Sequence, residues 1–321
     1  MSQQSVLYDV PGPRQRRLTL IGSVVATVLL LAAAYFLVYR PLNDKGQFSM
    51  ELWGPLIDPS NENFSLVWKR IGTGITNTLT AAALAIVSSL VVGTLLAVLR
   101  IQLKSLTQRR FTGLATPLAY LLRGLSTLLS AVTRVCVEVF RGLPVVITIF
   151  FVARGFPEFG VSFDTLWYLV IGLTIYNSVV IAEILRSGME GLPGGQAEAA
   201  SAIGLSPLQT TRMILLPQAF RIMLPALISQ LVVVLKDTSL GFIISYEETL
   251  NIGKQIIGAL DNPIQVYIVI AVLFILVNYA LSKLAQYVQH RLSRGRKTAG
   301  TPAQNPPPAA LTAQAEGTGA A

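Results

Sequence analysis

The chain has 321 residues, of which 52% are hydrophobic and 13% are charged, and its formal net charge is +9. Soluble globular chains carry about 25% charged residues, so this composition excludes an ordinary water-exposed surface and indicates a polytopic membrane protein. A single cysteine and a single histidine exclude an internal disulfide, a Cys/His zinc site and a histidine-based catalytic triad of ordinary make-up. The positive charge is typical of the basic loops of a membrane protein, and we expect no nucleic-acid partner.

Apolar stretches along the chain predict the membrane spans, since about 20 apolar residues cross a ~30 Å hydrocarbon core. The segment 111–122 is apolar but too short to cross, so we expect it to be interfacial or buried. We expect the third span to break at Arg141–Pro144, where glycine and proline interrupt the helix. The predicted fold is an all-α integral membrane protein with about six transmembrane helices, at 18–38, 71–99, 130–153, 166–186, 214–240 and 264–287.

Basic residues predict the orientation of these spans. Lysine and arginine concentrate before the first span and after the second, fourth and sixth, which places both termini in the cytoplasm. We expect a cytoplasmic N-terminus at 1–17, an extracytoplasmic loop at 39–70 and a disordered cytoplasmic tail at 291–321. The alternative that 18–38 is a cleaved signal peptide is disfavoured because its apolar stretch exceeds the usual 7–15 residues.

The loop between the fourth and fifth spans, residues 191–217, carries the clearest local signals and is named the elbow below. Pro193, Gly194 and Gly195 are typical of a turn. Residues 196–203 predict a short alanine-rich helix, with Glu198 in the first turn where the helix dipole favours a carboxylate.

The second half of the elbow predicts a bend and another helix. Gly204 can take the left-handed conformation that ends the first helix. Ser206 and Pro207 suit the N-cap and first position of a second helix, which we expect to end near Ile214. Pro217 then marks the start of the fifth span. A helix–glycine–helix shape of this kind suits insertion into a groove of a partner.

The spacing of the elbow resembles the EAA loop of ABC-importer permeases. Further motifs resemble those of the polar-amino-acid permeases, which form the histidine/glutamine/glutamate permease family. Their sequences are most similar to those of actinobacterial glutamate-uptake permeases. The resemblance covers roughly 71–290. The residues that carry it are Glu198-Ala199-Ala200, Gly204, Ile214 and Leu216-Pro217 in the elbow, with the motifs at 138–144, 176–186, 194–196, 216–219 and 236–240.

The resemblance implies a transport subunit at 71–290, preceded by one extra helix, in the bacterial plasma membrane. It implies a second permease subunit (identical or homologous), a dimer of ABC ATPases, and an extracytoplasmic binding protein that delivers a polar amino acid, most simply glutamate or glutamine. The chain contains no G-x-x-x-x-G-K-[ST] loop. We therefore expect ATP and Mg to be used by the partner ATPase, and this chain to bind no cofactor or metal and to have no catalytic residue.

The resemblance also implies which residues meet the ATPase. Small alanine side chains permit close approach there, and the glycine permits the bend; an ordinary alanine-rich helix would explain the composition but not the full spacing. The implied coupling residues are Gly195, Gln196, Glu198, Ala199, Ala200, Gly204, Ile214, Leu216 and Pro217.

Polar residues inside the spans are candidates for the transport pathway or for gating, because charges at membrane depth are costly without a partner. Glu138 with Arg141, and Glu183 with Arg186, stand three residues apart and can meet on one helical face, either as structural salt bridges or as gating contacts. Asn177 and Gln230 could line a polar path or bridge two helices, and bridging is the commoner case. The remaining candidates, which could line the path or anchor the outer interface, are Lys236, Asp237, Thr238 and Ser239.

Glycines within the spans predict close helix packing rather than ligand contact. We expect this of Gly72, Gly74, Gly93, Gly172 and Gly188.

Two other classes of protein remain as alternatives. An ion-coupled secondary transporter or channel would not need the elbow and would more often show broken spans in both halves of the chain. An intramembrane hydrolase would need a nucleophile paired with a base, and no span contains a histidine.

Overall fold

The computed structural model describes residues 12–108 and 116–293, and all its regular elements over those ranges are helices. Six of them are long and apolar enough to cross a membrane, which confirms the predicted all-α fold with about six transmembrane helices. In chain order the elements are α1 (Pro13–Ala33), the π-helical η1 (Ala34–Tyr39), α2 (Arg40–Asp44), α3 (Met50–Ile57), α4 (Phe64–Gln108), α5 (Thr116–Gly142), α6 (Val145–Glu158), α7 (Thr165–Glu190), α8 (Gly195–Ala202), α9 (Pro207–Thr210), the π-helical η2 (Thr211–Leu215), α10 (Leu216–Asp237), the 3-10 helix η3 (Thr238–Ile244), α11 (Thr249–Leu260) and α12 (Pro263–Ser293).

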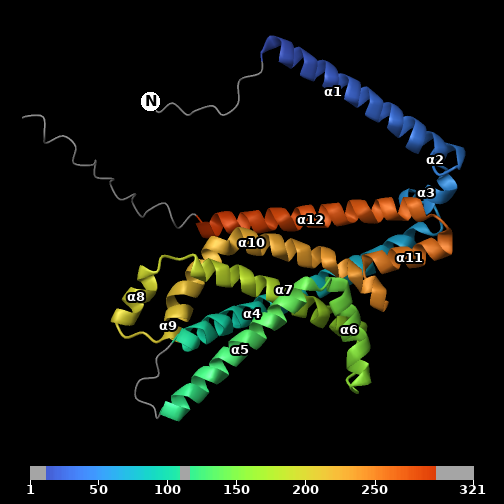
Figure 1. Cartoon of the computed structure of the whole chain (residues 1–321). Coiled ribbons are helices and arrows are strands. Elements are labelled where there is room, and N and C mark those ends of the chain that lie inside the picture. The colour runs from blue at the N-terminus through green and yellow to red at the C-terminus, as the bar shows by residue number, and fades with distance from the viewer. Residues whose placement is uncertain (1–11, 109–115, 294–321) are drawn as a thin grey trace, which may run out of the picture.

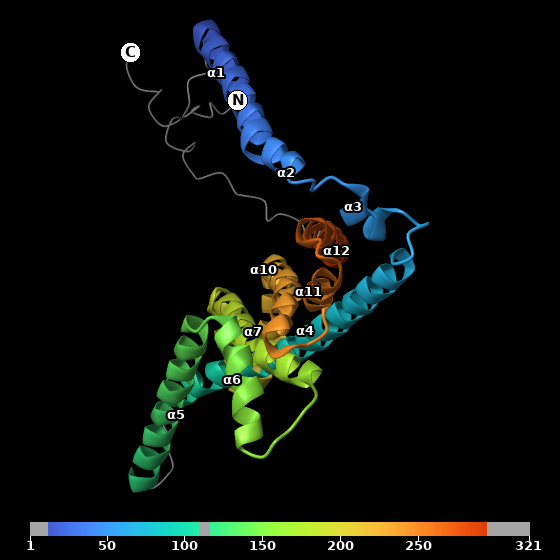
Figure 2. The same cartoon turned by 90° about the vertical axis from the view of Figure 1, so that its right-hand side faces the viewer.

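The first helix stands apart from the rest of the molecule. Helix α1 begins at Pro13, whose fixed φ suits the first position of a helix, and it continues without a gap through η1 into α2. None of its residues is buried, and it lies away from the other long helices in both views (Figures 1 and 2). It covers the predicted span 18–38 as an accessory helix outside the bundle.

The bundle is built around α7, which is the most enclosed of the long helices. Helix α4 runs along it, and α6 and α10 pack on its other sides. Small residues on α4, including Ala81, Ala85 and Ala97, are fully buried. Their size lets the backbones of α4 and α7 approach closely, which is how membrane helices gain van der Waals contact.

Most of the glycines expected at close contacts are found there. A Cβ atom added at Gly93 would lie 2.8 Å from Ile181 Cγ2, and one at Gly172 would lie 2.8 Å from the Ile149 Cα. A Cβ would also be crowded at Gly74, 2.9 Å from the Thr249 Cα, and at Gly188, 2.5 Å from Met223 Cγ. The expectation is wrong for Gly72, because nothing lies within 4 Å of the position its Cβ would take.

The loop expected at 39–70 folds into a cap on one end of the bundle. Its helix α3 contributes Leu56 to an apolar cluster with residues of α4, α11 and α12. The buried amide of Gln265 donates from Nε2 to the Gln47 carbonyl over 2.6 Å, and Asn262 Nδ2 donates to the Leu52 carbonyl over 3.0 Å. Figure 1 shows this cap end, with α3 and α11, opposite the end that carries α8 and α9.

The third predicted span is divided between two helices. Helix α5 ends at Gly142, and Pro144 adopts extended backbone (φ −60°, ψ 137°) before α6 begins, which confirms the expected break. The prediction that 111–122 is a separate short segment is wrong for 116–122, which belong to α5, while 111–115 lie outside the described residues. Arg123 therefore does not end a separate segment. One charged side chain interrupts the run of apolar residues, but it does not interrupt the backbone hydrogen bonds of the helix.

Candidate functional site

The elbow forms the bend that its local sequence predicts. Gly204 has φ +83°, and around it the Leu205 N–H donates to the Ala200 carbonyl and the Gly204 N–H to the Ser201 carbonyl, both over 3.0 Å. This pair of bonds is the Schellman ending of a helix, which favours glycine at the left-handed position. A Cβ there would be strained by the backbone conformation even though space is available.

The second helix of the elbow starts with a reciprocal cap. Gln209 N–H donates to Ser206 Oγ over 3.3 Å, and the Ser206 N–H donates to Gln209 Oε1 over 2.8 Å. Both donors would otherwise be unsatisfied at a helix start. The bend and the start of α9 are therefore fixed by hydrogen bonds among neighbouring residues.

The expectation that the second helix ends near Ile214 is wrong. The chain remains helical from α9 through η2 into α10, and the Leu216 N–H donates to the Thr211 carbonyl in the wider π pattern. Pro217 lacks an N–H and its ring would press on the carbonyl four residues earlier, and a π turn just before it relieves this conflict. The elbow is thus joined to the span without a flexible break.

Two sets of amide contacts attach the elbow to the bundle. Gln196 on α8 and Gln218 on α10 exchange hydrogen bonds of 3.1 and 2.8 Å. On the other side, Gln102 of α4 donates to Thr211 Oγ1 over 2.9 Å. We name these the Gln196–Gln218 clamp and the Gln102–Thr211 clamp. These hydrogen bonds join the elbow to α10 and to α4.

The outward surface of the elbow combines a carboxylate with apolar side chains. Glu198, Ala199 and Gly204 are exposed, whereas Ala200 faces inward and is buried. Ile203 and Leu208 are also exposed, with 77% and 53% of their surface accessible. These two residues were not among the predicted coupling residues. Their position on either side of Gly204, in a loop expected to contact a partner, could have predicted an apolar contact surface. The surface suits a partner groove.

The other predicted coupling residues frame this surface. Gly195 starts α8 and is exposed. Ile214 and Leu216 are half-buried on η2 and α10, and Pro217 is exposed. These residues lie at the junction of the elbow with the bundle. The sequence did not indicate which of the predicted coupling residues belong to this junction and which to the outward surface.

An ion cluster lies where α4 and α7 approach the elbow. The predicted pair forms: Arg186 Nε donates to Glu183 Oε2 over 3.1 Å, with a second contact between the same side chains. Arg100 also contacts Glu183, and Lys104 Nζ donates to Glu190 Oε1 over 2.8 Å, while Arg186 contacts Glu190. Arg100, Lys104 and Glu190 were not predicted as members of this cluster. The spacing of four residues between Arg100 and Lys104, and of seven between Glu183 and Glu190, already places each pair on one face of its helix.

The pair expected between Glu138 and Arg141 does not form. Glu138 Oε1 instead accepts from Arg134 Nε over 3.0 Å, one turn earlier on α5. The helix ends at Gly142, immediately after Arg141, and Arg134 stands at the i−4 position that favours ion pairs on a continuous helix.

Deeper in the bundle, Asn177 and Gln230 bridge two helices. Gln230 Nε2 donates to Asn177 Oδ1 over 2.7 Å, joining α10 to α7, and Asn177 Nδ2 donates to the Leu173 carbonyl over 2.9 Å. Asn177 is fully buried. The bridge satisfies amide groups that would otherwise be costly among apolar side chains.

The four predicted residues 236–239, at the junction of α10 with η3, do not form contacts with one another as a unit. Lys236 is exposed and Asp237 is half-buried, and no ion pair joins either one to another described residue. Thr238 and Ser239 donate their hydroxyls to the carbonyls of Leu235 and Lys236. Lys236 and Asp237 therefore differ in exposure, and their assignment to the transport path or to the outer interface stays a prediction.

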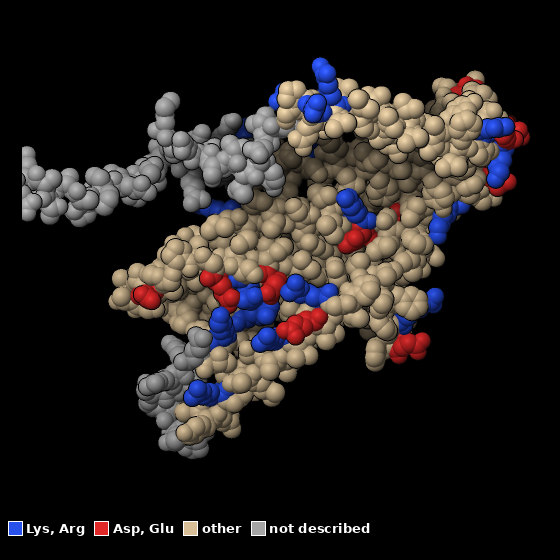
Figure 3. Space-filling view, turned by 45° about the horizontal axis from the view of Figure 1, so that its top comes forward, with Lys and Arg blue, Asp and Glu red and all other residues tan. Residues whose placement is uncertain are grey.

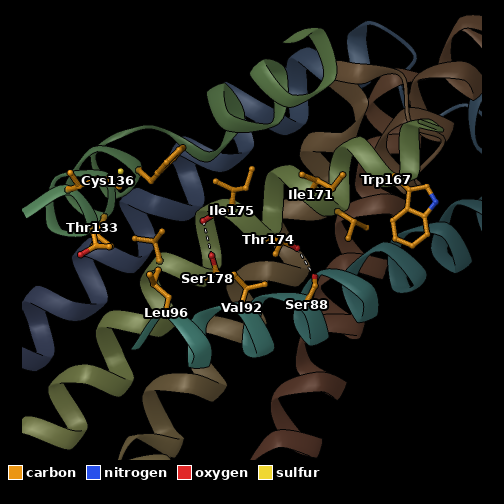
Figure 4. A pocket seen from close by; sticks show the side chains of 15 residues that line it. Ser88, Val92, Leu96, Thr133, Cys136, Trp167, Ile171, Thr174, Ile175 and Ser178 are labelled. Carbon is orange, nitrogen blue, oxygen red and sulfur yellow. Dashed lines mark hydrogen bonds between the residues drawn. The ribbon is translucent and has the colours of Figure 1, made fainter. Parts of the chain in front are cut away.

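A cavity of about 520 Å³ lies between α4, α5 and α7 (Figure 4). Its hydroxyl groups are already bonded within the chain: Ser88 to Thr174 over 2.6 Å, and Ser178 to the Ile175 carbonyl over 3.1 Å. Apart from these hydroxyl residues, Thr133 and Cys136, the lining residues are apolar. None of the predicted pathway residues lines it. The cavity suits an apolar occupant rather than a polar substrate.

Over the described ranges, no group of three histidine, cysteine, aspartate or glutamate side chains could hold a metal ion. Figure 3 shows broad uncharged flanks, interrupted by patches where basic and acidic side chains lie together. Uncharged flanks are what a membrane-spanning bundle requires.

Comparison with known proteins agrees with this architecture. The family described as binding-protein-dependent transport system inner membrane component matches residues 113–294. The glutamate transport system permease protein of Corynebacterium glutamicum is 37% identical over 259 residues, covering 79% of this chain and 85% of that protein. The glutamine transport system permease protein of Escherichia coli is 31% identical over 163 residues, covering 50% of this chain and 74% of that protein.

Solved structures show the same fold. A crystal structure of an amino acid ABC transporter with histidines matches with a TM-score of 0.57 at 23% identity, over 72% of this chain and 99% of that one. An inward-facing structure of the MetNI methionine ABC transporter matches with a TM-score of 0.56 at 21% identity, over 72% of this chain and 99% of that one. The chain is a multi-pass membrane protein and belongs to the family of inner membrane components of binding-protein-dependent transport systems.

Proposed function

We propose that this chain is the permease subunit of an ATP-driven importer for a polar amino acid, with glutamate or glutamine as the first candidates. The family and the names of the relatives in Corynebacterium glutamicum and Escherichia coli support this substrate class. The observation that carries the proposal is the elbow: an exposed helix–glycine–helix surface at one end of the bundle, attached to it by two amide clamps.

The elbow would act as the coupling element of the importer. A pair of partner ATPases binds ATP and Mg, and their closure pushes the elbow. The Gln196–Gln218 clamp would pass the displacement to α10, and the Gln102–Thr211 clamp would pass it to α4. The ion cluster joins α4 to α7 at the same end, so these helices would move together between inward-open and outward-open states.

The remaining partners follow from the same proposal. A second permease subunit completes the pathway, and an extracytoplasmic binding protein delivers the substrate at the cap end. Both termini would then lie in the cytoplasm, in agreement with the basic residues at the start of α1 and around the end of α12. Arg141 and Lys236 remain candidates for attracting an anionic substrate, since both are exposed at the ends of spanning segments.

Uptake in cells tests the substrate. Labelled glutamate, glutamine and arginine would be supplied to cells lacking this chain and to the same cells complemented with it. We expect loss and rescue of glutamate or glutamine uptake. Rescue of arginine uptake alone would discard the substrate but keep the transport class. No change in any of the three, with redundant carriers removed, would refute the proposal.

The docking role of the elbow has its own test. The double variant Glu198→Lys with Gly204→Leu should abolish co-purification of the ATPase while leaving membrane insertion intact, because it reverses the exposed charge and blocks the left-handed bend. Glu62→Lys, an exposed charge reversal at the cap end, is the matched control and should leave co-purification unchanged. Uptake that survives loss of the partner's phosphate-binding lysine would instead favour an ion-coupled transporter.

A further inference from the structure

The apolar cavity between α4, α5 and α7 is as long as a lipid tail. Its first and last lining residues on α7, Trp167 and Val179, stand 12 positions apart, which is about 18 Å of helix at about 1.5 Å per residue. Figure 4 shows Trp167 and Ser88 near one end of the cavity and Leu96 near the other. One leaflet is half of a hydrocarbon core of about 30 Å, so the cavity is about as long as one leaflet is thick.

The cavity is also too narrow for a helix. Its volume of about 520 Å³, spread over about 18 Å, gives a mean cross-section of about 29 Å², or about 6 Å across. A helix with its side chains is about 10–12 Å in diameter, whereas an acyl chain is a single file of methylene groups. A polar substrate is disfavoured, because the hydroxyls of Ser88, Thr174 and Ser178 are already bonded within the chain.

One side of the cavity is open to the surroundings of the chain. Cys136 is exposed, and 43% of Val92 and 49% of Val132 are accessible, although all three residues line the cavity. An acyl chain can therefore enter laterally from the bilayer without passing through the packed bundle.

The end of the cavity near Leu96 leads to the ion cluster. Arg100 follows Leu96 by one turn on α4, and Glu183 follows Val179 by one turn on α7. The side chains of Arg100 and Glu183 contact each other. An apolar cavity and a group of charges are therefore adjacent along the same pair of helices, which is the arrangement that an amphiphile requires.

The ion cluster has one positive charge in excess. Three cationic side chains share two carboxylates, and 56% of the Lys104 side chain is exposed, so Lys104 can meet a further anion. Phosphate groups form strong charge-assisted hydrogen bonds with lysine and arginine. The members of the cluster are Arg100, Lys104 and Arg186, with Glu183 and Glu190.

We propose that an anionic phospholipid binds at this position, with one acyl chain in the cavity and its phosphate beside Lys104. Basic pockets between transmembrane helices suit anionic headgroups, and the tail would fill the space between three helices without disturbing their polar groups. The site lies in the leaflet nearest the elbow, which is the cytoplasmic leaflet in the orientation proposed above. Lipid binding itself does not depend on the proposed transport function.

Photoreactive lipids test the site in the whole transporter, reconstituted in vesicles of phosphatidylethanolamine. One sample contains phosphatidylglycerol with a diazirine in its acyl chain, and the other contains phosphatidylcholine with the same chain. Mass spectrometry locates the adducts. We expect phosphatidylglycerol to label the cavity, including the segment around Cys136, at least threefold more than phosphatidylcholine does. Helix α1, none of whose residues is buried, reports labelling by bulk lipid and should not distinguish the two probes.

Substitutions that fill the cavity or remove the exposed cation test each half of the site. Val92→Trp from α4 and Cys136→Phe from α5 should each lower labelling of the cavity at least fivefold. Val91→Trp is the matched control, because Val91 is 54% exposed and does not line the cavity, and it should leave labelling unchanged. Lys104→Gln should reduce the preference for phosphatidylglycerol to less than twofold. Size-exclusion chromatography identifies variants that still assemble, and the two filling variants provide independent tests.

Several outcomes would overturn the proposal. They are equal labelling of the cavity by the two lipids, labelling that survives both filling variants, and protection of the cavity by an excess of a polar amino acid. Labelling of the cavity no stronger than that of α1 would also overturn it, as expected if a second permease subunit covered the opening. None of these readouts requires transport. Loss of the uptake phenotype would therefore discard the proposed function and leave the lipid site standing, whereas equal labelling in a transporter that rescues uptake would refute the lipid site alone.

Discussion

Gly93 offers a sharp test of the contact between α4 and α7 that organises the bundle. A Cβ atom at this position would lie 2.8 Å from Ile181 Cγ2 and 2.8 Å from the Ser178 carbonyl oxygen, whereas carbon atoms in good contact are about 3.5–4.0 Å apart. Because the oxygen belongs to the backbone of α7, the helices must separate to admit a methyl group. Gly72, on the same helix, has nothing within 4 Å and is the matched control.

The expected magnitude follows from two opposing effects. Replacing a helical glycine with alanine gains about 0.5–1 kcal/mol of helix stability at either position. Overpacking at Gly93 costs about 1–3 kcal/mol, and the control lacks this cost. The difference between Gly93→Ala and Gly72→Ala is therefore about 1–3 kcal/mol, which corresponds to a difference in Tm of about 2–12 °C at about 2–4 °C per kcal/mol.

The measurement is thermal unfolding of the two purified variants in the same detergent, followed by size-exclusion chromatography of the protein that remains folded. We expect Gly72→Ala to melt at or slightly above the parent and Gly93→Ala to melt below both. A Gly93→Ala variant that melts with the control, or above it, would show that α4 and α7 do not approach as closely as described.

Three further outcomes are expected. Gln102→Leu removes the 2.9 Å bond to the elbow and should lower uptake at least threefold with ATPase co-purification retained; unchanged uptake would contradict its role in transmission. Glu183→Gln should lower the Tm more than Lys104→Gln, because Glu183 accepts from two guanidinium groups while the Lys104 side chain is 56% exposed and an exposed pair contributes only about 0–1 kcal/mol; the reverse order in a melting experiment would refute this. Burial raises the pKa of the Glu248 carboxyl from 4.5 to about 7, so the folded state binds its proton more tightly than the unfolded state does. Stability should therefore fall as pH rises from about 4.5 through about 7. Glu248→Gln should flatten that part of the Tm–pH curve, and an unchanged slope would refute this role of Glu248.

Local sequence signals were sufficient for the bend and the helix cap of the elbow, and for the existence of most spans, although not for where the elbow's second helix and the third span end. Gly204 fixes the bend through its own φ, and Ser206 with Gln209 builds the cap within four residues. The membrane-spanning segments are likewise indicated by their own apolar composition and length, because each must match the hydrocarbon core of the bilayer whichever helices it packs against. These features were predictable because each is decided by residues adjacent in the chain.

Tertiary structure decided which polar groups meet. Arg100 and Glu183 are separated by 83 positions in the chain, and Gln230 and Asn177 by 53. No periodicity within one helix identifies such partners, because the rotation and depth of the facing helix determine them. Glu138 was paired wrongly for a related reason: two basic residues, Arg134 and Arg141, lay within reach of it on one helix, and the spacing alone did not distinguish between them.

The same division separates glycines that look alike in the sequence. Gly72 and Gly93 both lie within the predicted span 71–99 on α4, yet Gly72 faces open space and Gly93 faces the backbone of α7. The sequence by itself determined that α4 is a membrane-spanning helix, that an elbow follows α7, and that the chain resembles a family of permeases. Only the packing of α4 against α7 decided which face of each helix is buried, because close contact depends on the shape of both surfaces at once.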